Sequence, residues 1–328
     1  MKRFKNILLV TDDDECTQDT ALQRAVALAE HNQADLTIIN ALNLPRDTSL
    51  PGDSASGRLK NAIIDGRQDQ LEKITASGPA SVNIRSKVIE GAIFPEIIQE
   101  VLRNGYDLVM KCAEETSSLQ DRIFGSTDMH LLRKCPCPVW IMKSNEKVKY
   151  QRIFAAVDVE DDNNDEIINS LNRQILEMAS SLALSEFSEL HIVHAWTAWV
   201  ESWLDPPPFG FMGSMDNGDV AEWVEQLRVV DETKMKNLIK TLTENIGQDD
   251  MGYLKPEVHF VKGAADEVIP RLAREKKADL IVMGTVVRTG IPGLIIGNTA
   301  ESILNNIGCS VLVVKPPGFI TPVHLDDK

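Results

Sequence analysis

The chain has 328 residues, of which 43% are hydrophobic and 25% are charged, and its formal net charge is −15. This length allows two domains of ordinary size, and the composition is typical of a soluble globular protein. The acidic excess argues against nucleic acid or an anionic membrane surface as a partner, because phosphate binding needs a basic surface. Five cysteines in a chain this long do not suggest a disulfide framework. No apolar run is long enough to span a bilayer and no signal peptide is recognisable, so we expect a cytoplasmic protein without membrane insertion.

The first half of the chain alternates strand-like and helix-like patterns. Residues 7–10 are a continuous apolar run, typical of a buried parallel strand, and helical periodicity follows over residues 20–31. Further strands are predicted at residues 36–39, 82–88, 108–110 and 139–142, and further helices at residues 59–75, 94–103 and 127–133.

The second half repeats this order of strands. We expect them at residues 153–157, 190–193, 258–261, 280–283 and 311–314. Strands that alternate with helices imply right-handed crossovers, so the sequence predicts two tandem, doubly wound α/β domains with parallel sheets of the Rossmann-like kind. The expected boundaries are a first domain at 1–143, a linker at 144–151, a second domain at 152–316 and a tail at 317–328.

Between residues 91 and 143, identical residues recur 172 positions later in the chain, without a gap. The pairs include Gly91 and Gly263, Ile97 and Ile269, Asp107 and Asp279, Gly125 and Gly297, Thr127 and Thr299, and Cys137 and Cys309. Chance apolar periodicity would not align glycines, an aspartate and a cysteine at one spacing. The two halves are therefore copies of one domain.

Ligands bind at the carboxyl ends of the strands in a doubly wound sheet, which directs attention to the segment after residue 283. Gly284 leaves this strand, and Gly297, Asn298 and Thr299 begin the next helix. A glycine lets backbone N–H groups approach an anion, and a helix N-terminus adds further N–H groups and the positive end of its dipole. The pattern predicts a phosphate site, and a simple helix cap is the competing interpretation.

Four groups of residues carry a family resemblance: Gly284-Thr285 with residues 288–290, then residues 294–301, 130–136 and 321–327. Through them the chain resembles the tandem members of the universal stress protein family, and most closely the E-type branch of Gram-negative bacteria. The resemblance spans nearly the whole chain. It implies a fold of the adenine nucleotide alpha hydrolase type and ATP as the ligand, with Mg²⁺, at no more than one site per chain.

ATP-binding members of that family carry a Gly-x2-Gly-x9-Gly-Ser/Thr pattern in the phosphate loop. Here Gly284 and Gly297 match, whereas Val287 replaces the second glycine and Asn298 the final Ser/Thr. The resemblance assigns nucleotide binding to Asp158, Ala195, Gly284, Thr285, Val287, Gly297, Asn298 and Thr299. It places the backbone around Ala195 near the base, and it makes Asp158 a candidate Mg²⁺ ligand.

The first copy departs further from this pattern. Cys112 stands where Gly284 stands in the second copy, and Glu115 stands where Val287 stands. A carboxylate at a phosphate position is repulsive, so we expect the first copy to bind no nucleotide.

The second copy also contains an aromatic insertion at residues 196–223. Its apolar side chains include Trp196, Trp199, Trp203, Phe209, Phe211 and Met212, and it contains three consecutive prolines. Such a segment is expected to pack on its own domain or its neighbour. The alternative is that it covers a pocket for an acyl or other apolar ligand.

The sequence and the resemblance together favour a stress-response protein that senses or regulates through a bound adenine nucleotide without fast catalysis. An apolar-ligand binder is the alternative, and a slow ATPase that uses Asp158 is a further one. We expect the final strands of the two copies, 139–142 and 311–314, to pair within the chain as a pseudo-dimer, because both are too apolar for an exposed edge. A homodimer of the tandem chain remains open. His191 and His194 should face opposite sides of their strand, so they cannot hold one metal together.

Overall fold

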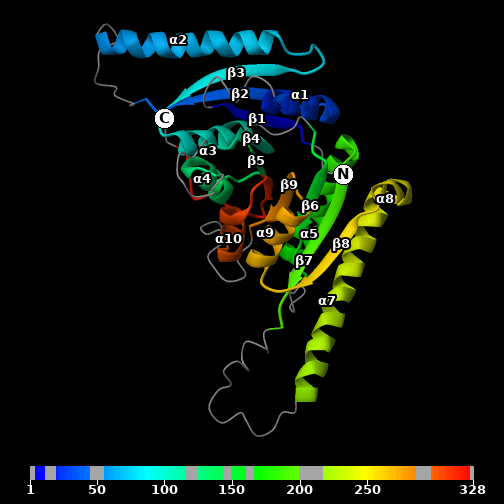
Figure 1. Cartoon of the computed structure of the whole chain (residues 1–328). Helices are drawn as coiled ribbons and strands as arrows, with labels where there is room; N and C mark the ends of the chain where they lie inside the picture. The colour runs from blue at the N-terminus through cyan, green and yellow to red at the C-terminus, as the bar shows by residue number, and fades with distance from the viewer. Residues whose placement is uncertain are drawn as a thin grey trace, which may run out of the picture. The chain divides into compact units, whose positions relative to one another are not determined.

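The computed structural model (Figure 1) describes residues 4–11, 20–44, 55–114, 124–143, 149–159, 166–198, 217–285 and 297–325. The chain divides into two compact units. The second-repeat unit is Gln151–Gly284, and the first-repeat unit joins Lys2–Tyr150 to Thr285–Lys328. The last helix and strand of the second repeat therefore belong to the compact unit that the first repeat builds.

The first-repeat unit contains a sheet in the order β3-β2-β1-β4-β5-β10. Its strands are β1 (Asn6–Thr11), β2 (Asp35–Leu42), β3 (Ile84–Glu90), β4 (Leu108–Cys112), β5 (Val139–Met142) and β10 (Ser310–Val314). The pairs among β1 to β5 are parallel, as predicted. Strand β10 runs antiparallel to β5, with Val311 opposite Ile141 and Val313 opposite Val139. This confirms that the final strands of the two copies pair with each other.

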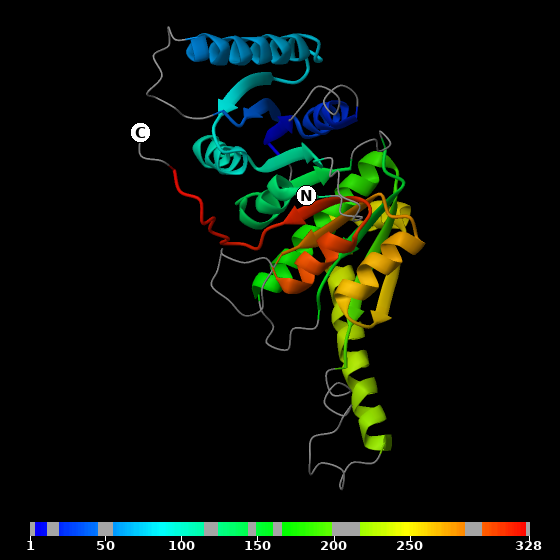
Figure 2. The same cartoon turned by 60° about the vertical axis from the view of Figure 1, so that its left-hand side comes forward.

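Helices pack on this sheet and along its edge. They are α1 (Thr20–Asn32), α2 (Ala55–Ala76), α3 (Ile93–Asn104), α4 (Ser126–Lys134) and α10 (Asn298–Asn306). Figures 1 and 2 both show α2 lying along β3 at the edge of the sheet. Helix α3 ends at Gly105, whose φ of 65° lies in the left-handed region that favours glycine.

The second-repeat unit contains a parallel sheet in the order β9-β6-β7-β8. Its strands are β6 (Arg152–Ala156), β7 (Glu189–Trp196), β8 (Glu257–Lys262) and β9 (Leu280–Gly284), and its helices are α5 (Glu166–Glu186), α7 (Asn217–Ile246), α8 (Gln248–Leu254) and α9 (Ala265–Glu275). All the predicted strands are present. The apolar runs predict the central strands well because their residues are almost wholly buried, as in β9, where Leu280, Ile281 and Val282 are fully buried.

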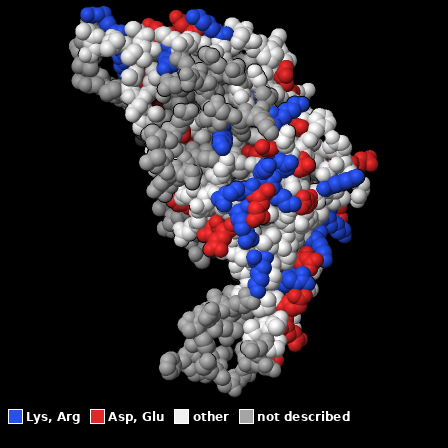
Figure 3. All heavy atoms as spheres, in the orientation of Figure 1, with Lys and Arg blue, Asp and Glu red and all other residues white. Residues whose placement is uncertain are grey.

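Helix α7 is the main element that the sequence analysis did not anticipate. It has 30 residues, and Trp223, which we had placed in the aromatic insertion, lies in it. Acidic and basic side chains alternate along its surface (Figure 3), and Arg228 bridges Glu225 at 2.7 Å and Glu232 at 2.8 Å. Pairs one turn apart support a helix that packs only part of its surface. None of the helices in the described ranges is long and apolar enough to cross a membrane.

Candidate functional site

Three of the predicted nucleotide-site residues lie at one edge of the second-repeat sheet. Asp158 follows β6, Ala195 lies near the end of β7, and Gly284 ends β9. Because these strands are parallel, their carboxyl ends share an edge. Asn172 on α5 fixes the backbone of Asp158: the Asp158 N–H donates to Asn172 Oδ1 at 3.1 Å, and Asn172 Nδ2 donates to the Asp158 carbonyl at 2.6 Å.

A cleft of about 440 Å³ opens beside Asp158. Its walls come from the end of β6 and from α5 and α7, and they include Asp158, Val159, Glu166, Arg173, Lys234 and Asn237. The volume falls within the range of small-molecule sites, and the lining carries both charges. The cleft can therefore accommodate a polar ligand with charged groups.

Gly284 has a packing role that its sequence context did not reveal. A Cβ at this position would lie 2.5 Å from Leu171 Cδ2 and 3.1 Å from Leu171 Cγ. Helix α5 thus packs so closely on β9 that no side chain fits between them. This contact accounts for the glycine without any ligand.

The remaining predicted residues belong to the first-repeat unit. Gly297 is the N-cap residue of α10, and Asn298 and Thr299, which open the helix, are exposed. Thr285 is buried and accepts a hydrogen bond from Lys315 Nζ at 3.4 Å. Burial lowers the pKa of Lys315 to about 8. Val287 lies outside the described residues.

The first repeat holds a carboxylate of its own at the start of α4. The N–H groups of Glu114 and Gly125 donate to Asp128 Oδ2 at 2.9 Å and 3.0 Å. Lys111 Nζ lies 3.1 Å from Asp128 Oδ1, and both side chains are completely buried. Burial raises the pKa of Asp128, and the Lys111 ammonium and the two N–H groups oppose this shift.

The Glu114 side chain covers Gly125 as well: a Cβ on Gly125 would lie 2.6 Å from Glu114 Cβ. The N-cap N–H of α4, the N–H of Glu114 after β4 and the neighbouring Lys111 ammonium are thus engaged by the chain's own Asp128. In the second repeat, Met283 and Ala300 stand where Lys111 and Asp128 stand in the first. Ala300 has no carboxylate and Met283 has no ammonium group, so these two positions of the second repeat cannot form the ion pair.

Cys112, the first-repeat counterpart of Gly284, is disulfide-bonded, which the sequence analysis did not anticipate. Cys135, Cys137 and Cys309 are buried thiols that are not in disulfides.

Of the aromatic insertion, the structure describes both ends. Trp196 is buried and belongs to a cluster with Ala198, Trp223, Val224 and Phe260. Its ring stacks on Phe260 with centroids 5.8 Å apart. Trp196 therefore joins β7, β8 and α7, as expected if the insertion packs on its own domain. Trp199, Trp203, Phe209, Phe211 and Met212 lie outside the described residues.

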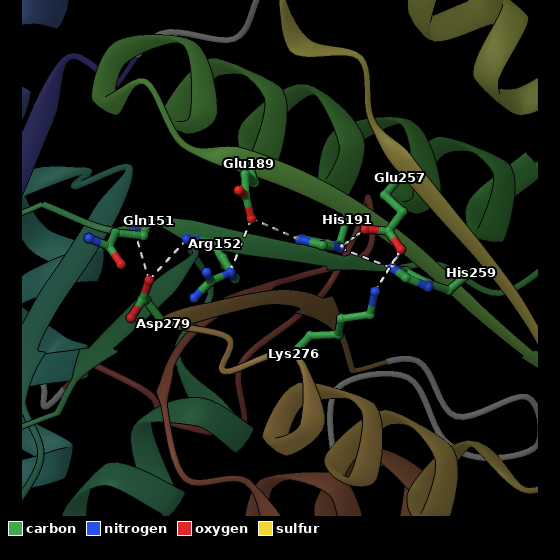
Figure 4. Close-up of polar contacts among 8 residues, drawn as sticks. All are labelled: Gln151, Arg152, Glu189, His191, Glu257, His259, Lys276 and Asp279. Atoms are coloured by element: carbon green, nitrogen blue, oxygen red, sulfur yellow. Dashed lines mark hydrogen bonds and ion pairs between the residues drawn. The ribbon is translucent and has the colours of Figure 1, made fainter.

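A second group of polar residues gathers near the amino ends of β7 and β8 (Figure 4). His191 is opposite Glu257 in the strand register, and His259 lies two residues further along β8 on the same face. Burial lowers the pKa of both histidines, which favours their neutral forms. His194 faces elsewhere, with Nδ1 3.2 Å from the Val157 carbonyl, as the alternation along β7 predicted.

Sequence reasoning missed this group, which we name the His191 cluster (His191, Glu257 and His259, with Glu189 and Lys276 beside them). The sequence analysis considered only the two histidines of one strand. The residues of the cluster come from two strands, β7 and β8, between which α7 and α8 lie in the sequence. The alternating Glu257 and His259 on β8 were the available signal. Their meaning depends on the register between β7 and β8.

Comparison with known proteins supports the resemblance inferred from the sequence. Residues 3–143 and 149–315 each match the Universal stress protein family. The chain is similar to Universal stress protein E of Escherichia coli K12, with 31% identity over 100% of this chain and 99% of that protein, and to a homolog in Haemophilus influenzae, with 29% identity over 96% and 98%. It is also similar to the crystal structure of a putative universal stress protein from Pseudomonas aeruginosa UCBPP-PA14, with a TM-score of 0.65, 26% identity and coverage of 95% and 94%. The chain belongs to the universal stress protein family, with two copies of its domain in tandem.

Proposed function

We propose that this protein acts in the stress response by binding an adenine nucleotide, ATP with Mg²⁺, in its second repeat. The bound nucleotide serves as a regulatory signal and is not turned over rapidly. The contrast between the repeats supports this proposal most strongly. In the first repeat the Asp128 carboxylate accepts from the N–H of Gly125, the N-cap of α4, and from the N–H of Glu114 after β4, whereas Ala300 stands at the matching position of the second repeat and provides no such anion.

Two other features of the second repeat suit a nucleotide, each in its own compact unit. Asn298 and Thr299 are exposed at the start of α10, where N–H groups and the helix dipole favour phosphate. Asp158 lies at the carboxyl end of β6 beside a cleft, where its carboxylate would hold Mg²⁺. The cation would neutralise phosphate charge, which matters in a protein with a net charge of −15.

The two repeats provide a matched pair of substitutions for testing this proposal. Asn298 and Ser126 occupy equivalent positions in the second and first repeats. Calorimetric titration of the untagged full chain with MgATP should show one site per chain. Asn298→Ala should weaken binding by about 10-fold or more, the effect of losing a hydrogen bond to a charged group, and Ser126→Ala should leave it unchanged. Two sites per chain, or equal effects of both substitutions, would contradict the proposal.

Mass spectrometry of small molecules extracted from the purified protein separates the nucleotide from the apolar-ligand alternative. A nucleotide at one per chain supports the proposal, and an acyl compound in its place overturns it. Phosphate release measured with Asp158→Ala addresses the slow ATPase. If a slow release is found and the substitution leaves it unchanged, a hydrolytic role for Asp158 is excluded.

A further inference from the structure

The His191 cluster presents three potential metal-ligand atoms to one point between β7 and β8. His191 Nδ1 lies 2.9 Å from His259 Nε2 and 3.4 Å from Glu257 Oε2. His259 Nε2 lies 3.7 Å from Glu257 Oε1. Figure 4 shows the three side chains converging from the two strands, with Lys276 reaching the Glu257 carboxylate from below.

These separations match the requirements of a zinc ion. With Zn–N and Zn–O bonds of about 2.0–2.1 Å, the ligand atoms of a tetrahedral site lie about 3.3 Å apart. The three distances in the cluster bracket this value, so shifts of a few tenths of an ångström would complete the site. Two histidines and one glutamate are also a ligand set that zinc sites use, with water at the fourth position.

Hydrogen bonding within the cluster bears on the same question. His191 Nδ1 and His259 Nε2 share a hydrogen bond at 2.9 Å, whose direction depends on the tautomers. The His191 side chain is 4% exposed, and its Nε2 has no hydrogen-bond partner among the described residues, with Glu189 Oε2 at 3.7 Å. If neutral His191 carries its proton on Nδ1, the lone pair of Nε2 faces the Glu189 carboxylate. If it carries the proton on Nε2, the lone pair of Nδ1 faces the Glu257 carboxylate. Either tautomer keeps the hydrogen bond to His259, but it also places a lone pair against an anionic oxygen.

A cation removes this conflict. With a metal among Nδ1 of His191, Nε2 of His259 and the Glu257 carboxylate, all three lone pairs point at positive charge. His191 then keeps its proton on Nε2, directed at Glu189, which is the carboxylate–histidine arrangement that orients metal-bound imidazoles. The Phe154 ring, with its centroid 4.8 Å from that of His191, supports the imidazole from the neighbouring strand.

We propose that His191, His259 and Glu257 form a zinc site that clamps β8 to β7, near the amino ends of these strands and away from the carboxyl ends that carry Asp158 and Gly284. Lys276 competes with the metal ion for the Glu257 carboxylate, because its Nζ lies 2.7 Å from Glu257 Oε1. In the metal-free protein this ammonium offsets the carboxylate charge. On zinc binding Lys276 turns into solvent, which its 40% exposed side chain permits.

The test measures Zn²⁺ binding to the untagged full chain by competition with a chromophoric chelator, with metal content checked by elemental mass spectrometry after dialysis. One Zn²⁺ per chain is expected. Glu257→Gln keeps the shape of a half-exposed side chain and should weaken binding by about 100-fold or more, since loss of an outer-shell partner alone costs about 10–100-fold. His259→Ala should have at least the same effect. His324→Ala, at an exposed histidine elsewhere, should leave binding unchanged.

Lys276→Met supplies a test in the opposite direction. Removing this positive charge from beside the site should tighten Zn²⁺ binding by about 3–10-fold. Co²⁺ in place of Zn²⁺ should give the intense visible absorption of a four-coordinate ion, and Glu257→Gln should abolish it. The proposal is overturned if no saturable Zn²⁺ site exists, or if Zn²⁺ binds equally well to the Glu257→Gln and His259→Ala proteins. Circular dichroism of each variant confirms that it is folded.

Discussion

The buried pair of Lys111 and Asp128 should be a principal determinant of the stability of the first-repeat unit. We consider Asp128→Ala, which copies the residue at the matching position of the second repeat. The substitution leaves the Lys111 ammonium completely buried without the opposite charge of Asp128, although Lys111 Nζ still donates to the Cys112 carbonyl at 2.9 Å. It also removes the acceptor for the N–H groups of Glu114 and Gly125.

Removing one member of a buried ion pair destabilises a protein by about 3–5 kcal/mol, because the remaining charge is uncompensated. In a unit of about 150–250 residues, each kcal/mol lowers the unfolding temperature by about 2–4 °C. Asp128→Ala should therefore lower the transition of the first-repeat unit by about 6–20 °C. The double variant Lys111→Met with Asp128→Ala reproduces the second repeat at both positions and should recover more than half of this loss, since no buried charge remains.

Differential scanning calorimetry is the appropriate assay, because two compact units can unfold in separate transitions. Both variants are compared with the parent protein under the same buffer conditions. A loss below about 1 kcal/mol for Asp128→Ala would show that water or a rearranged side chain compensates Lys111. A double variant as unstable as the single one would show that the lost N–H acceptor, and not the unpaired charge, dominates.

Three further predictions concern other buried groups. Gly284→Ala should cost about 1–3 kcal/mol through its contact with Leu171, and the cost should be smaller when measured in a Leu171→Ala background; equal costs in both backgrounds would refute the packing role. Trp196→Ala should cost about 3–5 kcal/mol in urea denaturation because the ring is buried, and a cost below about 1 kcal/mol would contradict the packing described here. The unfolded-state pKa of Lys315 is near 10.5 and its folded-state pKa about 8, so the unfolded state binds more protons between these values. Stability of the parent protein relative to Lys315→Met should rise by up to about 1.4 kcal/mol per pH unit in that window and stay constant below pH 7; a pH-independent difference would contradict the lowered pKa.

Most of the fold could be predicted from the sequence because its central strands are almost wholly buried and appear as short apolar runs. The constant spacing of 172 residues also relates β4 to β9 and β5 to β10. The antiparallel pair of β5 and β10 could also be anticipated, since both strands are too apolar to remain at an exposed edge. Helix α7 was missed because ion pairs along its exposed surface, such as Arg228 with Glu232, contribute to its stability without a strong apolar pattern.

The sites were harder to predict, for different physical reasons. The role of Gly284 depends on how closely α5 approaches β9, a distance that no local pattern encodes. The His191 cluster depends on the register between two strands more than 60 residues apart in the chain. Asp128 could have been noticed by comparing the repeats at positions where they differ, because an aspartate opposite an alanine marks a change in chemistry at the same backbone position.

The pairing of β10 with β5 has a practical consequence for dissecting this protein. A cut at the boundary between the repeats would separate β10 from β5 and leave an apolar edge on each fragment. Such fragments are expected to aggregate alone and to recover solubility when mixed, as complementing halves do. Because both repeats lie in one chain, β5 and β10 can pair with each other at any protein concentration.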